Sequence, residues 1–345
     1  MKALVKTQKG EGFLELRDVP EPGKPAAGFV KIRIAACGIC GTDIHVKHDE
    51  FPYWPPVILG HEFTGTVIEV GPECVLAKVG DRVVAEPHTL ACGVCYLCRT
   101  GHVQICSSKR SPGWGIDGAM TSFINYPEKL LHKIPAHMSF EQAALVEPTA
   151  NAVTDVVERA GITAGDFVAV IGPGAIGLLS AMVARAAGAR QVVVIGTPGD
   201  EQLRLSKARE LGFTTVNIGS QNAAEMVLAL TDGRGADMVI ECSGSPRAIP
   251  GTVDLVRKRG KICAIGLTGG KMVEFPWDKF AFKVCDLIFN LSTSYTSWDR
   301  TIALIANGQV PAEKLITHQA PLADWESTFT ACENLQALKA LLIPS

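Results

Sequence analysis

The sequence predicts an α/β protein with two parts, a mostly antiparallel, partly closed β domain and a doubly wound parallel sheet. Short alternating strands interrupted by glycine and proline fill residues 1–150, a rhythm typical of antiparallel sheets. Apolar runs then alternate with helical stretches over residues 151–292, as right-handed crossovers in a parallel sheet require. The length of 345 residues also suits two domains of about 150 residues each.

In the first part, apolar and polar residues alternate with a period of two, which places one face of each strand in a core. The last fifty or so residues contain one helix-like and one strand-like run. The strand-like runs of the first part are VKIRIAAC (30–37), FTGTVIEVG (63–71) and GDRVVAEP (80–87), and the C-terminal runs are TIALIANGQV (301–310) and ALKALLIP (337–344).

The second part begins with a glycine-rich turn between an apolar run and a stretch of small helix-forming residues. Gly172, Gly174 and Gly177 have G-x-G-x-x-G spacing, in which two glycines allow a tight turn and close approach of a pyrophosphate. The third glycine lets the helix pack on the strand, and the helix N-terminus faces the phosphates. We therefore expect these glycines, with Ala175 and Ile176, to bind a dinucleotide. The strand-like runs are FVAVIG, QVVVIG, TTVNI, ADMVIECSG, KICAIG and LIFNLS.

The end of the second of these strands leaves the choice between NAD and NADP open. Dinucleotide folds that prefer NAD usually have an acidic residue there to hold the ribose 2′-hydroxyl, but this chain has Gly196 followed by Thr197. Arg204 follows in EQLRLSKAREL, which is either an ordinary charged helix or a source of contacts to a 2′-phosphate. Gly196, Thr197 and Arg204 are the candidate residues at the ribose.

Four cysteines predict a structural zinc site. Cys92, Cys95, Cys98 and Cys106 form a C-x2-C-x2-C-x7-C pattern, and four thiolates so spaced can complete a closed tetrahedral shell. A disulfide knot or a set of unrelated buried thiols is the alternative, but the chain shows no secretory features and the cysteines are closely clustered. The N-terminal MKALVKTQKGEGF has no apolar signal core, so a cytoplasmic location is expected.

A second cluster predicts a catalytic zinc site with an open position. Cys40 in CGICGTDIH and His61 with Glu62 in PPVILGHEFTG offer a thiolate, an imidazole and a carboxylate, the mixed donors of catalytic zinc. Asp43 could orient a ligand imidazole, and Thr42 with His45 could relay a proton. Cys37 could form a dithiol pair with Cys40, but its alternating apolar surroundings favour a buried strand residue.

With these motifs, the chain resembles the zinc-dependent medium-chain alcohol and polyol dehydrogenases, in particular the branch that contains sorbitol and threonine dehydrogenases. The resemblance extends from Met1 to the C-terminus. The resemblance implies a GroES-like catalytic domain of residues 1–150 and 293–345 and a Rossmann domain of residues 151–292. It also implies that Glu147, in ALVEPTANAV, is either a zinc ligand or a carboxylate near zinc-bound water. Two zinc ions per chain, NAD or NADP, and a homo-oligomer (dimer or tetramer) are further expectations.

The reaction that the resemblance implies is hydride transfer between a secondary alcohol of a polyol or sugar-like substrate and NAD(P). Thr42 and His45 would carry the proton, Asp43 would act on the zinc ligands and Glu147 would act at the metal. Alternatives are a threonine-type amino-alcohol or small diol dehydrogenase and a non-enzymatic nucleotide-binding sensor. His88 and Trp114 are candidates for lining the substrate pocket.

The composition excludes some partners. The 33 lysine and arginine residues against 35 acidic residues give a formal net charge of −2, which does not favour nucleic acid or an anionic membrane surface. The uncharged run 167–184 is long, but Gly-Pro-Gly at 172–174 divides it into a strand and a helix. A small-molecule polyol or alcohol is the expected partner.

Overall fold

The computed structural model describes residues 1–344 and divides into two compact units. One unit comprises Met1–Glu147, Ser292–Asn307 and the chain from Pro311 onward, and the other comprises Pro148–Leu291 and Gly308–Val310. The predicted fold class is confirmed, because the first unit holds mostly antiparallel sheets and the second a purely parallel one.

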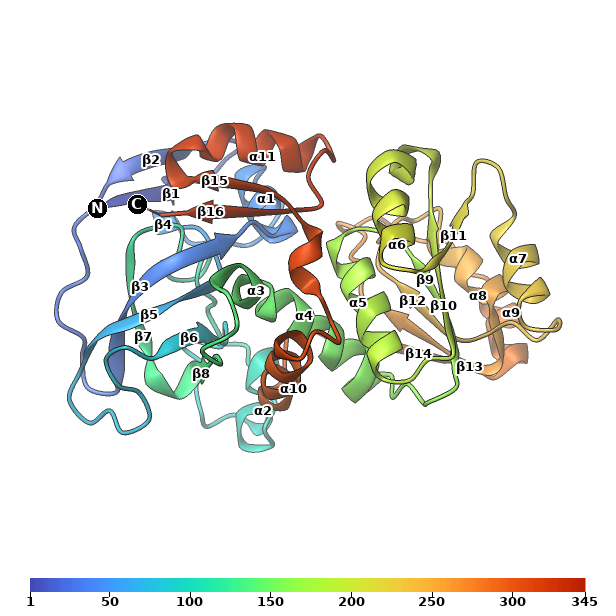
Figure 1. The fold of residues 1–345 in the computed structure, drawn as a ribbon, viewed down its shortest axis with the longest axis horizontal. Coiled ribbons are helices and arrows are strands. Elements are labelled where there is room, and N and C mark those ends of the chain that lie inside the picture. The colour runs from blue at the N-terminus through green and yellow to red at the C-terminus, as the bar shows by residue number, and fades with distance from the viewer. Residues whose placement is uncertain (345) are drawn as a thin grey trace. The chain divides into compact units, whose positions relative to one another are not determined.

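The first unit contains a small and a large sheet (Figure 1). The small sheet has the order β2-β1-β4, and the large one has the order β15-β16-β3-β5-β6-β8, with β7 paired to β3. The C-terminal strand β16 runs antiparallel to β3, with Leu341 beside Gly38. The strands are β1 (Lys2–Lys6), β2 (Leu14–Asp18), β3 (Phe29–Gly38), β4 (Val57–Ile58), β5 (Glu62–Val70), β6 (Arg82–Ala85), β7 (Phe123–Pro127), β8 (Leu131–Lys133), β15 (Ile316–Pro321) and β16 (Lys339–Ile343).

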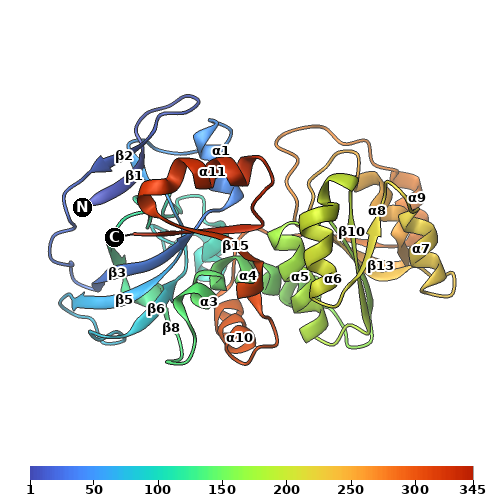
Figure 2. The same cartoon turned by 45° about the horizontal axis from the view of Figure 1, so that its top comes forward.

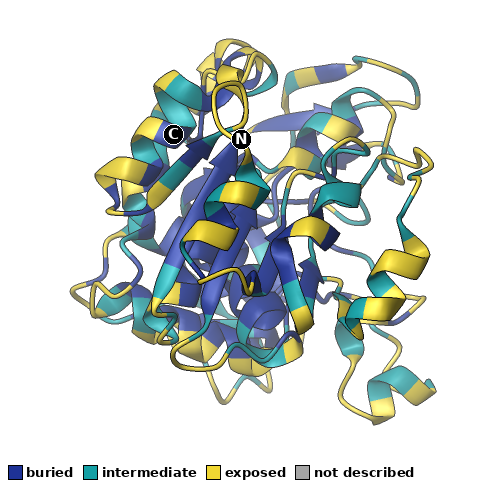
Figure 3. Ribbon diagram, turned by 90° about the vertical axis from the view of Figure 1, so that its right-hand side faces the viewer, coloured by how far each residue is buried: buried dark blue, intermediate teal, exposed yellow. Residues whose placement is uncertain are grey.

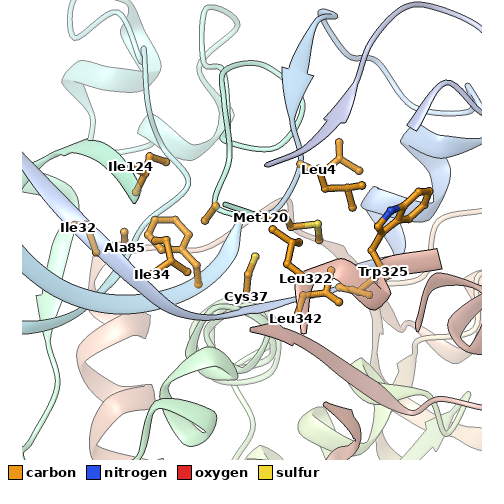
Figure 4. Close-up of a cluster of buried hydrophobic side chains, with 14 of the residues drawn as sticks. Leu4, Ile32, Ile34, Cys37, Ala85, Met120, Ile124, Leu322, Trp325 and Leu342 are labelled. Carbon is orange, nitrogen blue, oxygen red and sulfur yellow. The ribbon is translucent and has the colours of Figure 1, made fainter. Parts of the chain in front are cut away.

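The core of the first unit joins residues from both ends of the chain. Leu4, Met120 and Leu342 pack in one apolar cluster with Cys37 and Trp325 (Figure 4). Cys37 is fully buried on β3, so the prediction of a strand cysteine in the core is confirmed. Helix α11 (Trp325–Glu333) packs against β15 and β16 (Figure 2).

Short helices complete the described structure. Helix α1 follows β3 after a two-residue interval and carries several of the predicted site residues. Helix α1 spans Gly41–Lys47. The remaining α-helices outside residues 160–290 are α2 (Tyr96–Arg99), α3 (Phe140–Ala144), α4 (Val146–Ala152) and α10 (Tyr295–Ala306). The 3₁₀ helices are Val103–Ile105, Glu128–Leu130, Pro198–Asp200, Ile249–Gly251, Ala312–Leu315 and Leu322–Asp324, and the π-helices are Val153–Arg159 and Glu201–Leu205.

The second unit is a six-stranded parallel sheet of order β11-β10-β9-β12-β13-β14. Its central strands are buried while the covering helices show exposed outer turns (Figure 3), which explains their nearly continuous apolar sequences. The order reverses direction at β9, the kind of position where α/β sheets bind ligands. The elements are β9 (Phe167–Ile171), α5 (Ala175–Ala186), β10 (Gln191–Gly196), α6 (Ser206–Glu210), β11 (Thr214–Asn217), α7 (Ala223–Ala229), β12 (Ala236–Glu241), α8 (Thr252–Leu255), β13 (Val256–Ala264), α9 (Trp277–Lys283) and β14 (Asp286–Phe289).

The predicted strand positions of the parallel sheet agree with this description, but one helix differs in detail. EQLRLSKAREL begins with a π-helical turn, Glu201–Leu205, before α6. Within residues 1–344 no helix has both the length and the apolar character required to cross a bilayer.

Candidate functional site

The four cysteines of the predicted structural site lie together in one loop of the first unit. Cys92 Sγ is 4.0 Å from Cys98 Sγ and 3.7 Å from Cys106 Sγ, and Cys95 Sγ is 3.9 Å from Cys106 Sγ. Tetrahedral zinc with Zn–S bonds of about 2.3 Å needs sulfurs about 3.8 Å apart. All eleven cysteines are free thiols, so the disulfide alternative is wrong and the donor set fits zinc.

Backbone N–H groups stabilise thiolates in this loop. Cys95 N donates to Cys92 Sγ at 3.4 Å, and Cys92 N donates to Cys106 Sγ at 3.5 Å. The N–H of Cys92 is the largest of the contacts that lower the pKa of Cys106 to about 6. Because metal ligation requires thiolates, the loop is prepared for a cation.

The three residues of the predicted catalytic zinc site also lie together in the structure. Donor atoms of Cys40, His61 and Glu62 all lie within 4.8 Å of one another. Cys40 immediately precedes α1, and Glu62 is the first residue of β5. Gly60, with a φ of +97°, makes the bend before His61, and a Cβ there would lie 2.6 Å from Cys37 Sγ. The bend therefore requires glycine, and it brings the adjacent His61 and Glu62 to one centre.

Asp43 connects two of these residues. Asp43 Oδ2 accepts a hydrogen bond from Cys40 N at 2.8 Å, and Oδ1 lies 3.8 Å from His61 Nδ1. Both Asp43 Oδ1 and His61 Nδ1 are buried and have no hydrogen-bond partner in the described structure. Burial alone would lower the pKa of His61, but the negative charges of Cys40 and Asp43 raise it well above its usual value. The donor atoms of Cys40, His61 and Glu62 fit a cation, and the role of Asp43 in orienting the imidazole stays a prediction.

Lys339 is a site residue that the sequence did not predict. Its Nζ pairs with Glu62 Oε2 and donates to the carbonyl oxygen of Ile39 at 3.1 Å. Lys339 and Glu62 are 4% and 1% exposed, so the ion pair is buried. A lysine inside the apolar strand ALKALLIP was the available signal, since a buried lysine needs a partner.

The two predicted glutamates differ in position. Glu62 belongs to the group with Cys40 and His61, whereas Glu147, buried at the start of α4, lies outside it. The charge of Glu147 nevertheless contributes to the raised pKa of His61, after burial and the charges of Cys40 and Asp43. Both carboxylates remain candidates for contact with a metal.

The two predicted relay residues share helix α1. Thr42 Oγ1 is 3.7 Å from Cys40 Sγ, and His45 Nδ1 is 2.8 Å from Glu50 Oε2. Residues three apart lie on neighbouring positions of a helix surface. No hydrogen bond joins Thr42 directly to His45 within residues 1–344, so the relay stays a prediction.

The glycine turn has the shape of a phosphate cradle. Gly172 has a φ of +93°, and a Cβ on it would lie 2.8 Å from Ser243 N. A Cβ on Gly177 would overlap the carbonyl oxygen of Gly172, so these two glycines are required by packing. Gly174 precedes α5 directly, and no described atom lies within 4 Å of a Cβ placed there. A phosphate could approach this open backbone and the N–H groups of Ala175 and Ile176.

The residues after β10 are held by Asp200. Its Oδ2 accepts hydrogen bonds from Thr197 N and Oγ1 at 2.9 and 2.7 Å, and its Oδ1 pairs with Arg204 Nη1 at 3.0 Å. Arg204 Nε is buried and has no hydrogen-bond partner in the described structure. A Cβ on Gly196 would lie 2.9 Å from Pro173 Cγ. The contacts predicted between Gly196, Thr197 or Arg204 and a ribose therefore stay a prediction.

The fold, the two donor clusters and the glycine turn together define a zinc-binding dehydrogenase of two units. Residues 26–136 match the family described as alcohol dehydrogenase GroES-like domain, and residues 175–307 match the zinc-binding dehydrogenase family. The chain belongs to the zinc-containing medium-chain alcohol dehydrogenase family. It is an NAD(P)-dependent oxidoreductase that acts on CH–OH donors.

Relatives match over the whole chain. The sorbitol dehydrogenase of Halalkalibacterium halodurans is 36% identical, covering 100% of this chain and 99% of that protein. The L-threonine 3-dehydrogenase of Bacillus licheniformis is 34% identical, covering 100% and 99%. The structure of a zinc-binding dehydrogenase from Sinorhizobium meliloti bound to NADP superimposes with a TM-score of 0.92 at 30% identity, covering 99% of each chain.

Proposed function

We propose that this enzyme oxidises a secondary alcohol of a polyol or sugar-like substrate with NAD or NADP, using a zinc ion at Cys40, His61 and Glu62. The carrying observation is the cluster of one half-buried cysteine sulfur with one buried imidazole and one buried carboxyl group. A bound zinc ion would supply Lewis-acid stabilisation of negative charge on the substrate oxygen. The unit with the antiparallel sheets would be the catalytic one, and the parallel sheet would bind the dinucleotide.

The protein groups have separate roles in this proposal. Asp43 fixes Cys40 through its backbone N–H and faces His61 Nδ1, so it positions two donors at once. Thr42 and His45 would accept and transfer the alcohol proton, with His45 already paired to Glu50 at the surface end. Glu147 would act as a ligand or as a nearby carboxylate. Gly174 and the first turn of α5 would hold the cofactor phosphates.

The relatives support a second candidate, a threonine-type amino-alcohol dehydrogenase, because sorbitol and threonine dehydrogenases match almost equally well. A zinc donor set that includes carboxylate supports a hydroxyl-rich, chelating substrate. Parallel assays with polyols, small diols and threonine, each with NAD and NADP, separate the two candidates. A non-enzymatic sensor would reduce neither cofactor.

We also propose a homo-oligomer in which β14 meets a second copy. This strand is last in the order of the parallel sheet, and Leu287 and Phe289 on it are 37% and 62% exposed. Exposed apolar edge strands are hazards unless something covers them. Light scattering on the purified protein should give a dimer or tetramer, and charged substitutions at Leu287 and Phe289 should shift it toward monomer.

The direct test of the proposal compares two cysteine substitutions. Cys40→Ala should lower the zinc content from about two ions per chain to about one and abolish turnover while leaving the unfolding temperature nearly unchanged. Cys95→Ala should also lose one ion but should lower the unfolding temperature, because a structural site contributes folding energy. Zinc analysis, calorimetry and cofactor reduction are the measurements.

The two variants control for each other, since each removes one thiol. A Cys40→Ala protein that retains two ions and normal turnover would refute the proposed centre. Loss of activity without loss of zinc would assign Cys40 to chemistry other than metal binding.

A further inference from the structure

Lys109 and Arg110 are two consecutive cations, and neither forms an ion pair in the described structure. Lys109 Nζ contacts only neutral oxygens, Gln104 O at 3.2 Å and Ser292 Oγ at 3.3 Å. Arg110 Nη1 donates to the carbonyl oxygens of Ser108 and Lys109, and its guanidinium lies 4.1 Å from the centre of the Trp54 ring. Buried or partly buried cations normally have an anionic partner, so this pair is unusual.

The backbone fixes Lys109 beside His88. Arg110 N donates to Thr89 O at 2.9 Å, and Ser111 Oγ donates to Pro87 O at 2.7 Å. These bonds hold segment 109–111 along segment 87–89. The Lys109 ammonium is therefore carried by a braced loop, and its position does not depend on a flexible surface segment.

Lys109 and His88 also converge on the same short segment from the C-terminal part of the unit. Lys109 reaches Ser292, and His88 Nε2 lies 2.9 Å from the carbonyl oxygen of the next residue, Thr293. Ser292 has a φ of +65°, a conformation that costs energy for a non-glycine residue and often marks functional sites. Trp298 Nε1 donates to Thr293 Oγ1 at 3.0 Å, which holds this strained segment in place.

His88 offers an acceptor next to the cation. Burial, aided by the charge of Lys109, lowers the pKa of His88 to about 3, so the imidazole is neutral. With Nε2 donating to Thr293 O, the other nitrogen is a lone-pair acceptor, and His88 Nδ1 is buried without a hydrogen-bond partner in residues 1–344. One cationic donor and one neutral acceptor suit a ligand that carries both an anion and a hydroxyl group.

Two electrostatic links connect Lys109 to the proposed catalytic centre. The charge of Glu147 affects both Lys109 and His61. Within the described residues, the hydrogen bonds of Lys109 Nζ end on neutral oxygens, so the cation keeps capacity for an anion.

We propose that the substrate carries an anionic group, a phosphate or a carboxylate, and that Lys109 binds it. This inference rests on the proposed polyol oxidation and adds the substrate class. A charge-assisted hydrogen bond to Lys109 would anchor the anionic end of the chain of hydroxyl-bearing carbons. The reacting carbinol would then lie at the centre formed by Cys40, His61 and Glu62.

The test uses substrate pairs that differ only in charge, with the zinc-loaded enzyme. A hexitol and a pentitol are compared with their terminal phosphates and with the corresponding sugar acids. The wild type should prefer one of the anionic members, and the phosphate and carboxylate arms show which anion it selects. Lys109→Met should lower the anionic-to-neutral ratio of kcat/KM by about 10- to 100-fold, as expected for a hydrogen bond to a charged group.

Two further variants make the result specific. Lys109→Arg keeps the charge and should retain most of the preference, while Lys24→Met removes an exposed lysine of the same unit and should change nothing. A structural role for Lys109, such as compensating the nearby thiolates, would instead lower kcat/KM for both members of a pair or release zinc. Either of those results, or a wild type that prefers the neutral member, overturns the inference.

A binding measurement separates this inference from the proposed function. If no polyol of either charge is oxidised, the proposed function fails. Calorimetric titration with inorganic phosphate and with a sugar acid then still tests Lys109. Weaker binding to Lys109→Met than to wild type and Lys24→Met supports the anion site, and equal binding to all three refutes it.

Discussion

Replacing Lys339 with methionine should destabilise the protein by about 3–5 kcal/mol, because it leaves the Glu62 carboxylate buried without its cation. Lys339 is 4% exposed and Glu62 is 1% exposed, so water cannot replace the lost partner. The ammonium also donates to Ile39 O at 3.1 Å, and that acceptor would lose a hydrogen bond. Methionine has a similar length, so the cavity contribution to the loss should be small.

A double-mutant cycle isolates the ion pair from other effects. Glu62→Gln removes the charge while keeping the shape, so adding Lys339→Met to that background should cost much less than 3–5 kcal/mol. Because Glu62 is also a proposed zinc ligand, all four proteins of the cycle carry Cys40→Ala and hold no zinc at this centre, and their denaturant unfolding gives the coupling energy. Lys133→Met is the control, since Lys133 pairs with Asp81 at 2.9 Å but is 53% exposed. Its cost should stay below about 1 kcal/mol.

Two results would refute the predicted role of the Lys339–Glu62 pair. If Lys339→Met costs no more than Lys133→Met, the buried pair does not stabilise the fold. If the effects of Lys339→Met and Glu62→Gln simply add, the two side chains are not coupled, and the position of Glu62 must be set by other contacts.

Two other predictions concern the parallel-sheet unit. Because a Cβ on Gly196 would lie 2.9 Å from Pro173 Cγ and 3.0 Å from Leu205 Cδ2, Gly196→Ala and Gly196→Asp should each cost about 1–3 kcal/mol of stability. Only Gly196→Asp should shift the kcat/KM ratio toward NAD, and an equal shift in the alanine variant would contradict a charge effect. Burial raises the pKa of Asp155 from 3.8 to about 7, so the contribution of this carboxyl to stability should fall as pH rises between these values. Asp155→Asn should therefore stabilise by roughly 4 kcal/mol at pH 8 and by roughly 2 kcal/mol at pH 5, measured by urea unfolding. A difference that does not change with pH would show that this carboxyl ionises normally in the fold.

The features that the sequence predicted well depend on local patterns. Strands such as β5 and β9 follow from apolar periodicity and from glycine and proline at their ends. The four-cysteine loop needs only short-range geometry, because Cys95 and Cys98 are already bonded through backbone N–H groups to the preceding cysteines. The glycine turn is equally local, since the oxygen of Gly172 excludes any side chain at Gly177.

The features that could not be predicted depend on pairs far apart in sequence. In the sequence, Lys339 is one polar residue in an apolar C-terminal run. Only the pairing of β16 with β3 shows that it lies beside Glu62. The sequence predicted no role for Lys109, and only the contact with Ser292 places it beside a strained polar segment. Gly196 could be interpreted as a missing acidic residue, but the steric reason for glycine there requires the positions of Pro173 and Leu205.

The charges at the proposed catalytic centre explain why a lysine is buried beside it. Asp43, Glu62 and Glu147 are buried carboxyl groups at or near this centre, and Cys40 is a half-buried thiol. The charges of Cys40, Asp43 and Glu147 all act on His61. Lys339 pairs with Glu62, and a divalent zinc ion would offset further negative charge. Uncompensated charge costs several kcal/mol in a protein interior, so without Lys339 a bound zinc ion would leave more negative charge unbalanced. The C-terminal strand therefore does more than close the sheet: it brings a cation to the acidic donor set.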